Sequence, residues 1–308
     1  MQVVHGYSHV PITARAAVIA IGNFDGVHRG HRALIGEAVV RGKALGRAPG
    51  AMVFEPHPRE YFQPNEQHFR LTALNRKLAL FEKLGLKLAF VQHFDHDLAA
   101  MKAEEFIERV LVAGLGVAHV IIGYDFYFGH KRGGNPEFMV QSGEQLGFGV
   151  TVMPPVAESG EVFSSSSVRL HLAQGDVRGA AQGLGENWRV SGKIVGGAKR
   201  GTGLGYPTAN VPMPKGTGLG HGIYAVRAHV DGKTLAAAAY LGTRPTFDDG
   251  MPVVEVFLFD FDGDLYGHDM EVEFVDFIRA DRKFHSSEEL VAQMHEDVAR
   301  ARAILAAG

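Results

Sequence analysis

Two histidines spaced for phosphate chemistry stand near the start of the chain. His28 and His31 follow an apolar run at 18–21 and a turn that contains Gly22 and Gly26. Glycines let backbone amides approach a ligand, and the first residues of a helix carry roughly half a positive charge. Two imidazoles can donate to phosphate oxygens as negative charge builds there. The stretch predicts a phosphate site, although a single glycine-rich turn is more often only a strand-to-helix connection.

Two further loops of the first half carry aromatic side chains. Residues 54–62 contain two prolines, which predict an extended loop that presents Phe62 beyond a strand end, or simply a stiff connection. Residues 122–135 bring Asp125 and Phe128 to a glycine-flanked turn. The aromatic rings of this turn can belong to a core, but a loop offers little room to bury them. We therefore expect them to form walls against which a planar ligand stacks.

A run of hydroxyl side chains opens another predicted helix. Ser164, Ser165 and Ser166 stand there with a fourth serine, and Arg169 follows within about one turn. Such residues can simply cap the helix N-terminus. The same hydroxyls, backbone amides and guanidinium can also hold a triphosphate.

The second half contains a glycine-rich stretch at 192–210. The glycines at 196 and 201 have P-loop spacing, but Thr202 stands where a P-loop requires lysine, and no helical pattern follows. These departures exclude a Walker A motif. The tetrapeptide Pro-Thr-Ala-Asn that ends the stretch is, in isolation, most often a turn.

Short apolar runs alternate with amphipathic windows from residue 17 to about 185. This alternation predicts a doubly wound parallel sheet with helices on both faces, which binds ligands at the carboxyl ends of its strands. Every loop described above for this half falls at such an end. The expected strands are 18–21, 51–54, 88–91, 119–122 and 149–153, and the expected helices are 30–45, 72–84, 103–111, 136–146 and 165–172.

From residue 188 onward the pattern changes to strands and hairpin turns. It predicts a small antiparallel β-barrel, with the dipeptides Asp231-Gly232 and Asp262-Gly263 as hairpin turns. A helix at 287–305 should follow the capping box that begins at Ser286. We expect one domain at 1–185, a second at 186–308, and a linker at 183–188. The strands expected in this half are 189–195, 222–230, 234–241, 253–261 and 270–278.

The composition excludes several classes of protein. The 308 residues are 46% hydrophobic and 21% charged, with a formal net charge of −3, which argues against a dedicated nucleic-acid binder. The absence of cysteine excludes disulfides, thiolate zinc sites and cysteine nucleophiles. No secretory signal or membrane-spanning run is evident, so we expect a cytoplasmic protein with no membrane partner. The oligomeric state stays open.

The motifs resemble, in order and spacing, those of the bacterial bifunctional riboflavin kinase/FAD synthetase family. The string GNFDGVHRGH at 22–31 is similar to the family's extended H-x-G-H signature. Segments similar to other family motifs occur at 54–58, 123–134, 164–169, 192–210, 241–247 and 254–267. This chain has Ser166 where the family usually has threonine, Thr202 where arginine is common, and Phe257 where histidine is frequent.

The resemblance implies that the first domain transfers an adenylyl group from ATP to FMN, which makes FAD and releases pyrophosphate. His28, His31 and Arg169 are then the expected catalytic residues. They would stabilise the transition-state charge, because the FMN phosphate is already an anion and needs no general base. The expected ligand-binding residues are Gly22, Asn23, Phe24, Asp25, Gly26, Phe62, Asp125, Phe128, Ser164, Ser165 and Ser166.

The resemblance also implies that the second domain phosphorylates riboflavin with ATP. Glu255 would serve as the base for the ribityl hydroxyl, although a glutamate in an apolar strand otherwise simply faces solvent. Thr208 and Asn210 would bind Mg²⁺, a hard cation that completes its shell from phosphates and water. Gly201, Gly205 and Arg279 are the remaining expected binding residues.

Two other functions remain open from the sequence. The first half could adenylylate a different phosphorylated acceptor, as other H-x-G-H proteins do, but those relatives lack the attached kinase signature. Alternatively, the chain could bind flavin with one or both sites inactive. The intact residues expected for catalysis weigh against that alternative. The small-molecule substrates expected for the chain are ATP, riboflavin and FMN.

Overall fold

The computed structural model describes residues 1–158, 160–196, 208–214, 216–242 and 252–307. The chain forms two compact units. One comprises Met1–Gln67 and Thr72–Ser164, and the other comprises His68–Leu71 and Ser165–Gly308. Among the described helices, none combines the length and apolar character needed to cross a membrane.

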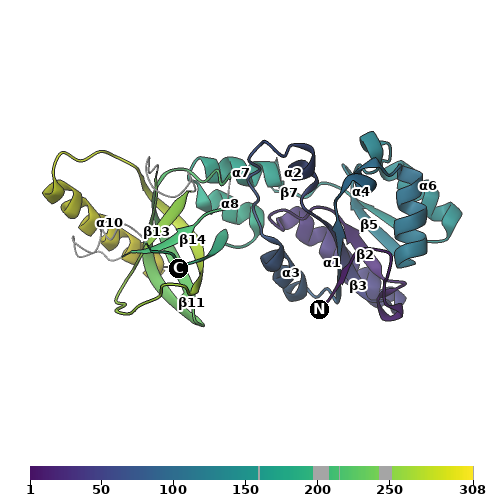
Figure 1. Cartoon of the computed structure of the whole chain (residues 1–308), viewed down its shortest axis with the longest axis horizontal. Helices are drawn as coiled ribbons and strands as arrows, with labels where there is room; N and C mark the ends of the chain where they lie inside the picture. The colour runs from purple at the N-terminus through teal and green to yellow at the C-terminus, as the bar shows by residue number, and fades with distance from the viewer. Residues whose placement is uncertain (159, 197–207, 215, 243–251, 308) are drawn as a thin grey trace. The chain divides into compact units, whose positions relative to one another are not determined.

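The first unit contains a six-stranded parallel sheet in the order β1-β4-β3-β2-β5-β6. Figure 1 labels β2, β3 and β5 of this sheet. This arrangement confirms the predicted parallel sheet and adds an edge strand, β1, that the sequence pattern missed. The strands are β1 (Gln2–His5), β2 (Val18–Ile21), β3 (Pro49–Glu55), β4 (Leu88–His93), β5 (His119–Gly123) and β6 (Gly149–Met153).

Helices cover both faces of this sheet because its central strand is apolar on both sides. On β2, Val18 packs in one apolar cluster with residues of helices α1 and α3. Ile19, on the opposite face, packs in another cluster with residues of η2 and α6. The helical segments are η1 (Ile12–Ala14), α1 (Arg29–Leu45), α2 (Pro58–Phe62), α3 (Leu74–Lys83), α4 (His96–Ala100), α5 (Ala103–Glu105), η2 (Phe106–Leu115), η3 (His130–Arg132) and α6 (Pro136–Leu146). A small hairpin of β7 (Ala157–Glu158) and β8 (Glu161–Val162) follows β6.

The strand order places the point where the sheet reverses its winding between β2 and β5. From β2 the chain proceeds to β3 and β4 on one side, and β5 and β6 lie on the other. Doubly wound sheets bind ligands in the crevice outside the carboxyl ends of the strands at such a point. The turns after β2 and β5 are therefore the two that the topology favours for a ligand.

The loop predicted at 54–62 is only partly extended. Pro58 begins the short helix α2, in which proline occupies the first turn and His57 is the N-cap. The His57 Nδ1 atom accepts a hydrogen bond from the Arg59 backbone N–H at 3.1 Å. A proline at N1 starts a helix as readily as it stiffens an extended loop, which is why the expectation was wrong for residues 58–62.

The second unit contains a six-stranded sheet in the order β10-β13-β12-β11-β14-β9, and a bridge between Val195 and Asn210 joins its two ends. This closure confirms the predicted antiparallel barrel. The strands are β9 (Arg189–Lys193), β10 (Ala209–Pro212), β11 (Gly222–Val230), β12 (Lys233–Leu241), β13 (Val253–Leu258) and β14 (Asp269–Ala280). The helices are α7 (Ser165–Ala173), α8 (Val177–Leu184) and α10 (Ser287–Ala307).

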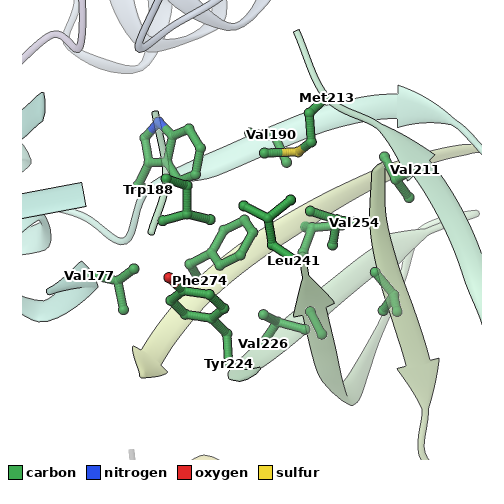
Figure 2. Close-up of a cluster of buried hydrophobic side chains, with 14 of the residues drawn as sticks. Val177, Trp188, Val190, Val211, Met213, Tyr224, Val226, Leu241, Val254 and Phe274 are labelled. Carbon is green, nitrogen blue, oxygen red and sulfur yellow. The ribbon is translucent and has the colours of Figure 1, made fainter. Parts of the chain in front are cut away.

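Aromatic rings fill one end of the barrel core (Figure 2). The Trp188 and Phe274 rings lie 5.2 Å apart, and Tyr224 meets Phe274 edge to face at 5.4 Å. The Trp188 indole N–H donates to the Leu71 carbonyl at 2.9 Å. Val177 of α8 belongs to the same core. Helix α8 is therefore part of the barrel unit, and the division of the two activities at residue 185 stays a prediction.

One predicted hairpin is confirmed and the other is wrong. Asp231 and Gly232 join β11 to β12 with positive φ angles of 49° and 72°, as a tight hairpin turn requires. The dipeptide at 262–263 does not join paired strands. The preceding β13 pairs with β10 and β12, whereas the following β14 pairs with β11 and β9. A turn dipeptide signals a local reversal but does not specify the partner of the next strand.

Candidate functional sites

The turn between β2 and α1 has a strained backbone. Phe24, Gly26 and Val27 have positive φ angles of 48°, 88° and 45°, respectively. This conformation is natural for glycine but costs about 1–3 kcal/mol for other residues, and β-branched valine rarely adopts it. Both non-glycine side chains are fully buried, so packing holds the turn in this form. Strain of this kind is typical of ligand-binding turns.

His28 is the N-cap of α1. Its Nδ1 atom accepts a hydrogen bond from the His31 backbone N–H at 3.4 Å. In the neutral tautomer that this bond implies, Nε2 carries the proton and can donate to a ligand. The His28 and His31 rings stack with centroids 3.6 Å apart and an interplanar angle of 26°. The structure therefore brings the two histidines together at a helix N-terminus, where anions bind favourably.

His31 has a buried ring atom with unused hydrogen-bonding capacity. Among the described residues, its Nδ1 has no hydrogen-bond partner. Burial of the ring, the neighbouring His28 and the Lys77 ammonium all lower the pKa of His31 well below its ordinary value of 6.5. The imidazole is thus neutral at physiological pH, with a polar atom suited to a ligand.

The lowered pKa of His31 links the stability of the first unit to pH. Below pH 6.5 the unfolded chain binds a proton at this residue and the folded chain does not, so stability falls as the pH drops below 6.5. We expect hydrogen exchange of the α1 amides to show a smaller free energy of opening at pH 5.5 than at pH 7.5. His31→Gln should reduce this difference, and an unchanged difference would contradict the assignment.

Helix α3 and the residues just before it contact the buried side chains of the turn between β2 and α1. Asp25 is buried, and its Oδ1 accepts a hydrogen bond from the Thr72 backbone N–H at 3.1 Å. Phe24 packs edge to face on Phe81, with ring centroids 5.3 Å apart. Both side chains are buried, so a ligand would contact Phe24 and Asp25 through their backbone atoms. The Gly22 amide donates to the Met52 carbonyl at 3.2 Å, which fixes the start of the turn to β3.

Lys77 is a residue at this site that the sequence motifs missed. Its Nζ donates to the Asn23 carbonyl at 2.7 Å, and the residue is 3% exposed. It shares the buried face of α3 with Leu80 and Phe81. A lysine at an apolar position of an amphipathic helix was the available sequence signal.

The predicted aromatic walls separate into exposed and buried rings. Phe62 is 63% exposed and lies edge to face with Phe94 at 5.7 Å, so its outer surface is open to a ligand. Phe128, in contrast, is 8% exposed and lies in the core of the first unit, stacked on Phe126 at 5.4 Å. The expectation that this loop would leave its rings exposed was wrong for Phe128, because the turn folds back onto the helices. Tyr124 and Tyr127, each 50% exposed, are the open rings there, and Asp125 is exposed beside them.

The serine run crosses from one unit to the other. Ser164 ends the first unit, whereas Ser165 and Ser166 begin α7 in the second. Arg169 also belongs to the second unit, where its Nε donates to the Phe69 carbonyl at 2.7 Å. This bond orients the guanidinium within its own unit. The structure therefore brings Arg169 together with the segment at 68–71.

The barrel places three polar side chains side by side on adjacent strands. Glu255 on β13 stands opposite Asn210 on β10 and opposite Tyr240 on β12. Residues directly opposite in an antiparallel sheet project from the same face, with Cβ atoms about 4.5–5.5 Å apart. On β13 the neighbouring Val254 and Val256 point into the barrel core, so the three polar residues lie on its outer face. The pairing of Asn210 with Glu255 is a relation that sequence spacing did not predict.

Two family models match the chain over almost its whole length. A model described as FAD synthetase matches residues 11–167, and one described as riboflavin kinase matches residues 184–305. The chain belongs to the bifunctional riboflavin kinase/FAD synthetase family. It therefore phosphorylates riboflavin to FMN and adenylylates FMN to FAD.

Curated relatives agree with this family, and a solved structure with a different title has a similar fold. A bifunctional riboflavin kinase/FMN adenylyltransferase from Pseudomonas fluorescens is 39% identical and covers 99% of this chain and 98% of its own. The protein of the same name from Escherichia coli K12 is 37% identical over 97% of this chain and 95% of its own. A crystal structure of a macrolide-efflux protein from Streptococcus pneumoniae matches with a TM-score of 0.84 and 26% identity, covering 97% of this chain and 98% of that one.

Several residues expected at the riboflavin kinase site have distinct surroundings. Asn210 is 5% exposed, and Thr208 directly precedes β10. Arg279 makes a two-pronged ion pair with the buried Asp297 of α10, with Nε to Oδ1 at 2.9 Å and Nη2 to Oδ2 at 2.8 Å. This pair ties the strand to the helix and orients the guanidinium. Gly201, Gly205 and the departure at Thr202, as well as residues 243–247 of a family motif, lie outside the described residues.

Gly30, in the first turn of α1, leaves no room for a larger side chain beside His28. A Cβ atom there would lie 3.0 Å from His28 Cε1 and 3.2 Å from the Phe163 carbonyl oxygen. Gly30→Ala should displace the His28 ring and lower the rate of FAD formation at least about 10-fold, since small misplacements are costly in catalysis. Gly36→Ala, on the same helix, meets nothing within 4 Å and should leave the rate unchanged. Equal rates of FAD formation in the two variants would contradict this prediction.

Proposed function

We propose that the two reactions use separate sets of residues, one around the turn of His28 and His31 and the other around Glu255. The single observation that carries this proposal is the placement of the two histidines in one unit and of the Asn210–Glu255 pair in the other. Each set supplies groups suited to a different step. The α/β set offers hydrogen-bond donors, and the barrel set offers a carboxylate beside a neutral oxygen ligand.

For adenylyl transfer, the phosphate of FMN attacks the α-phosphate of ATP, and pyrophosphate leaves. The attacking phosphate is already ionised, so the protein need not remove a proton. His28 and His31, with the amides at the start of α1, stabilise negative charge on the reacting phosphates. Support comes from the stacked rings, the helix N-terminus and the buried Nδ1 of His31 that has no partner among the described residues.

Other residues in the adenylyl-transfer proposal bind the substrates. Ser164, at the end of the α/β unit, offers a hydroxyl suited to phosphate oxygens, and Ser165, Ser166 and Arg169 offer hydroxyls and a guanidinium of the same kind in the barrel unit. Phe62 stacks on the flavin with its exposed ring. Asp125, on the exposed turn after β5, contributes a polar contact. Gly22, Asn23 and Gly26 contribute backbone groups.

For riboflavin phosphorylation, the 5′-hydroxyl of the ribityl chain attacks the γ-phosphate of ATP. Glu255 orients this hydroxyl and accepts its proton as the oxygen–phosphorus bond forms. Its half-buried position on β13, which pairs with a strand on either side, favours one orientation of the carboxylate. ADP is the leaving group, and the product is FMN.

Mg²⁺ fits the donor set proposed for the kinase. The described residues contain no cluster of three or more histidines or acidic residues that could hold a metal ion by themselves. The Thr208 hydroxyl and the Asn210 amide oxygen would contribute neutral ligands, and the buried position of Asn210 restricts its amide. When bound, the ion would neutralise charge on the ATP phosphates. We also propose that the protein works in the cytoplasm, where both reactions can use ATP without its export.

A time course tests the order of the two reactions. The protein is incubated with riboflavin, ATP and Mg²⁺, and flavins are separated by chromatography. FMN should appear first and FAD later, and conversion of added FMN to FAD should occur without riboflavin. Formation of FAD with no FMN intermediate would contradict the proposed sequence of reactions.

A further inference from the structure

Lys77 is a charged side chain buried in the α/β unit. It lies on the core-facing side of α3, with Leu80 three residues and Phe81 four residues further along, and 3% of its surface is exposed. Burial of an ammonium group is unfavourable unless hydrogen bonds and neighbouring charges compensate for the lost hydration. An apolar residue would extend this face of the helix without that cost. Core packing therefore does not account for a lysine at this position.

The ammonium group of Lys77 directly contacts the turn between β2 and α1. Its Nζ donates to the Asn23 carbonyl at 2.7 Å, one residue before the left-handed Phe24. Two residues along the turn, Asp25 accepts the Thr72 backbone N–H at 3.1 Å. Lys77 of α3 and Thr72, which precedes that helix, thus hold the strained turn at two closely spaced points. A change at Lys77 would release one of them.

The charge of Lys77 also reaches the His31 ring. Besides burial, the groups that lower the pKa of this imidazole are His28 on the same turn and the Lys77 ammonium on α3. Both disfavour protonation of the ring and thereby lower the pKa of His31, in the same direction as burial does. A neutral imidazole keeps one nitrogen as an acceptor, whereas a protonated ring has two donors. The state of His31 decides which partners its ring nitrogens can take.

We propose that Lys77 is a positioning residue for adenylyl transfer, which fixes the Asn23 carbonyl and sets the electrostatic environment of His31. It acts through these two residues and does not contact the substrate. This role rests on the proposed placement of the ATP phosphates at His28 and His31. It adds a residue of α3, outside the H-x-G-H turn, to the apparatus that prepares the turn for catalysis.

Four variants of the full-length protein separate charge, hydrogen bond and packing. Lys77→Arg keeps the charge, Lys77→Gln keeps a donor for Asn23 without the charge, and Lys77→Met removes both. Lys83→Met is the matched control, because Lys83 is exposed near the end of the same helix. The kcat and KM of FAD formation are measured from FMN and ATP, and FMN formation from riboflavin is measured in the same preparations.

Loss of the buried charge should lower kcat for FAD formation. We expect Lys77→Met to reduce this kcat at least about 10-fold, since small displacements of catalytic groups are costly. The KM for FMN should change less than about 2-fold, because FMN binding does not use Lys77. Lys77→Arg should recover most of the rate, Lys77→Gln should recover little, and FMN formation should be unchanged in all four variants.

The pKa of His31 provides a second measurement. If Lys77 only stabilised the fold, this pKa would not depend on whether the side chain at position 77 is charged. The ring is followed by NMR with ¹³C-labelled histidine, assigned by comparison with His31→Gln. Removal of the positive charge makes protonation easier, so Lys77→Met and Lys77→Gln should raise the pKa of His31. Lys77→Arg and Lys83→Met should leave it at the wild-type value. An unchanged titration in Lys77→Met would overturn the electrostatic role.

Other outcomes would overturn the proposal as clearly. A folded Lys77→Met protein that makes FAD at the wild-type rate would do so. Neutral variants that fail to fold, while Lys77→Arg folds, would show that Lys77 serves only the stability of the unit. His28→Ala distinguishes failure of the underlying site: full FAD formation in that variant would refute the placement of the phosphates, whereas its loss alongside an active Lys77→Met would refute only the role of Lys77.

Discussion

His28→Ala is expected to lower the rate of FAD formation about 10²–10³-fold, the usual effect of removing one donor that stabilises transition-state charge. The imidazole lies at the N-terminus of α1, stacked on His31, where negative charge on the reacting phosphates would be stabilised. FMN formation should stay close to normal, since we assign it to the other unit. The measurement is the initial rate of each reaction, starting from FMN for one and from riboflavin for the other.

Loss of the helix cap is a separate effect that a second variant removes. His28 accepts the His31 backbone N–H, and alanine cannot, which costs about 1 kcal/mol of stability. His28→Asn keeps a side chain that caps helices well but lacks the imidazole. It should lose FAD formation as severely as His28→Ala does. The exposed His9 provides the control, because His9→Ala should leave both rates unchanged. An equal loss of both activities in the His28 variants would refute the assignment of two separate sites.

Glu255→Gln should have the reciprocal effect. We expect it to lower the rate of FMN formation about 10²–10⁴-fold, the range typical of a lost general base. Glutamine has nearly the same shape as glutamate and can keep its place on β13 between Asn210 and Tyr240, but it cannot accept the proton. Conversion of added FMN to FAD should be unaffected. Rates are measured by chromatography of the flavins at saturating ATP and Mg²⁺.

The control for this variant is an exposed glutamate of the same unit. Glu296→Gln on α10 removes one negative charge at an exposed position and should leave FMN formation unchanged. A Glu255→Gln protein with normal FMN formation would show that the carboxylate acts neither as a base nor in orienting the hydroxyl. Glu255→Asp shortens the side chain but keeps the base, so a partial rate there would support the assigned role.

Much of the fold follows from local sequence patterns. Strand β2 and helix α6 begin and end at the predicted residues, because apolar runs, amphipathic periodicity, caps and turn residues act over a few positions. The turn at Asp231 and Gly232 is similarly local, since φ angles of 49° and 72° are a property of those two residues. The H-x-G-H turn is also local, and it identifies His28 and His31 without any long-range contact.

Pairing between distant strands depended on the tertiary structure. Strands β13 and β14 are consecutive in the chain but do not pair, and the short β10 lies beside β13. Register across the barrel places Asn210 opposite Glu255, residues 45 positions apart in the sequence. No local pattern contains this relation, because it is set by how the barrel closes.

Burial of particular side chains was also decided by the tertiary structure. Phe128 belongs to a loop by its local sequence, yet its ring is enclosed by helices from other parts of the unit. Lys77 stands at an apolar position of α3 by its sequence pattern, but its partner, the Asn23 carbonyl, is known only once α3 is placed against that turn. The sequence by itself determined which chemical groups are available and which turns present them. The tertiary structure decided which of these groups share a buried environment, because burial depends on neighbours that are distant along the chain.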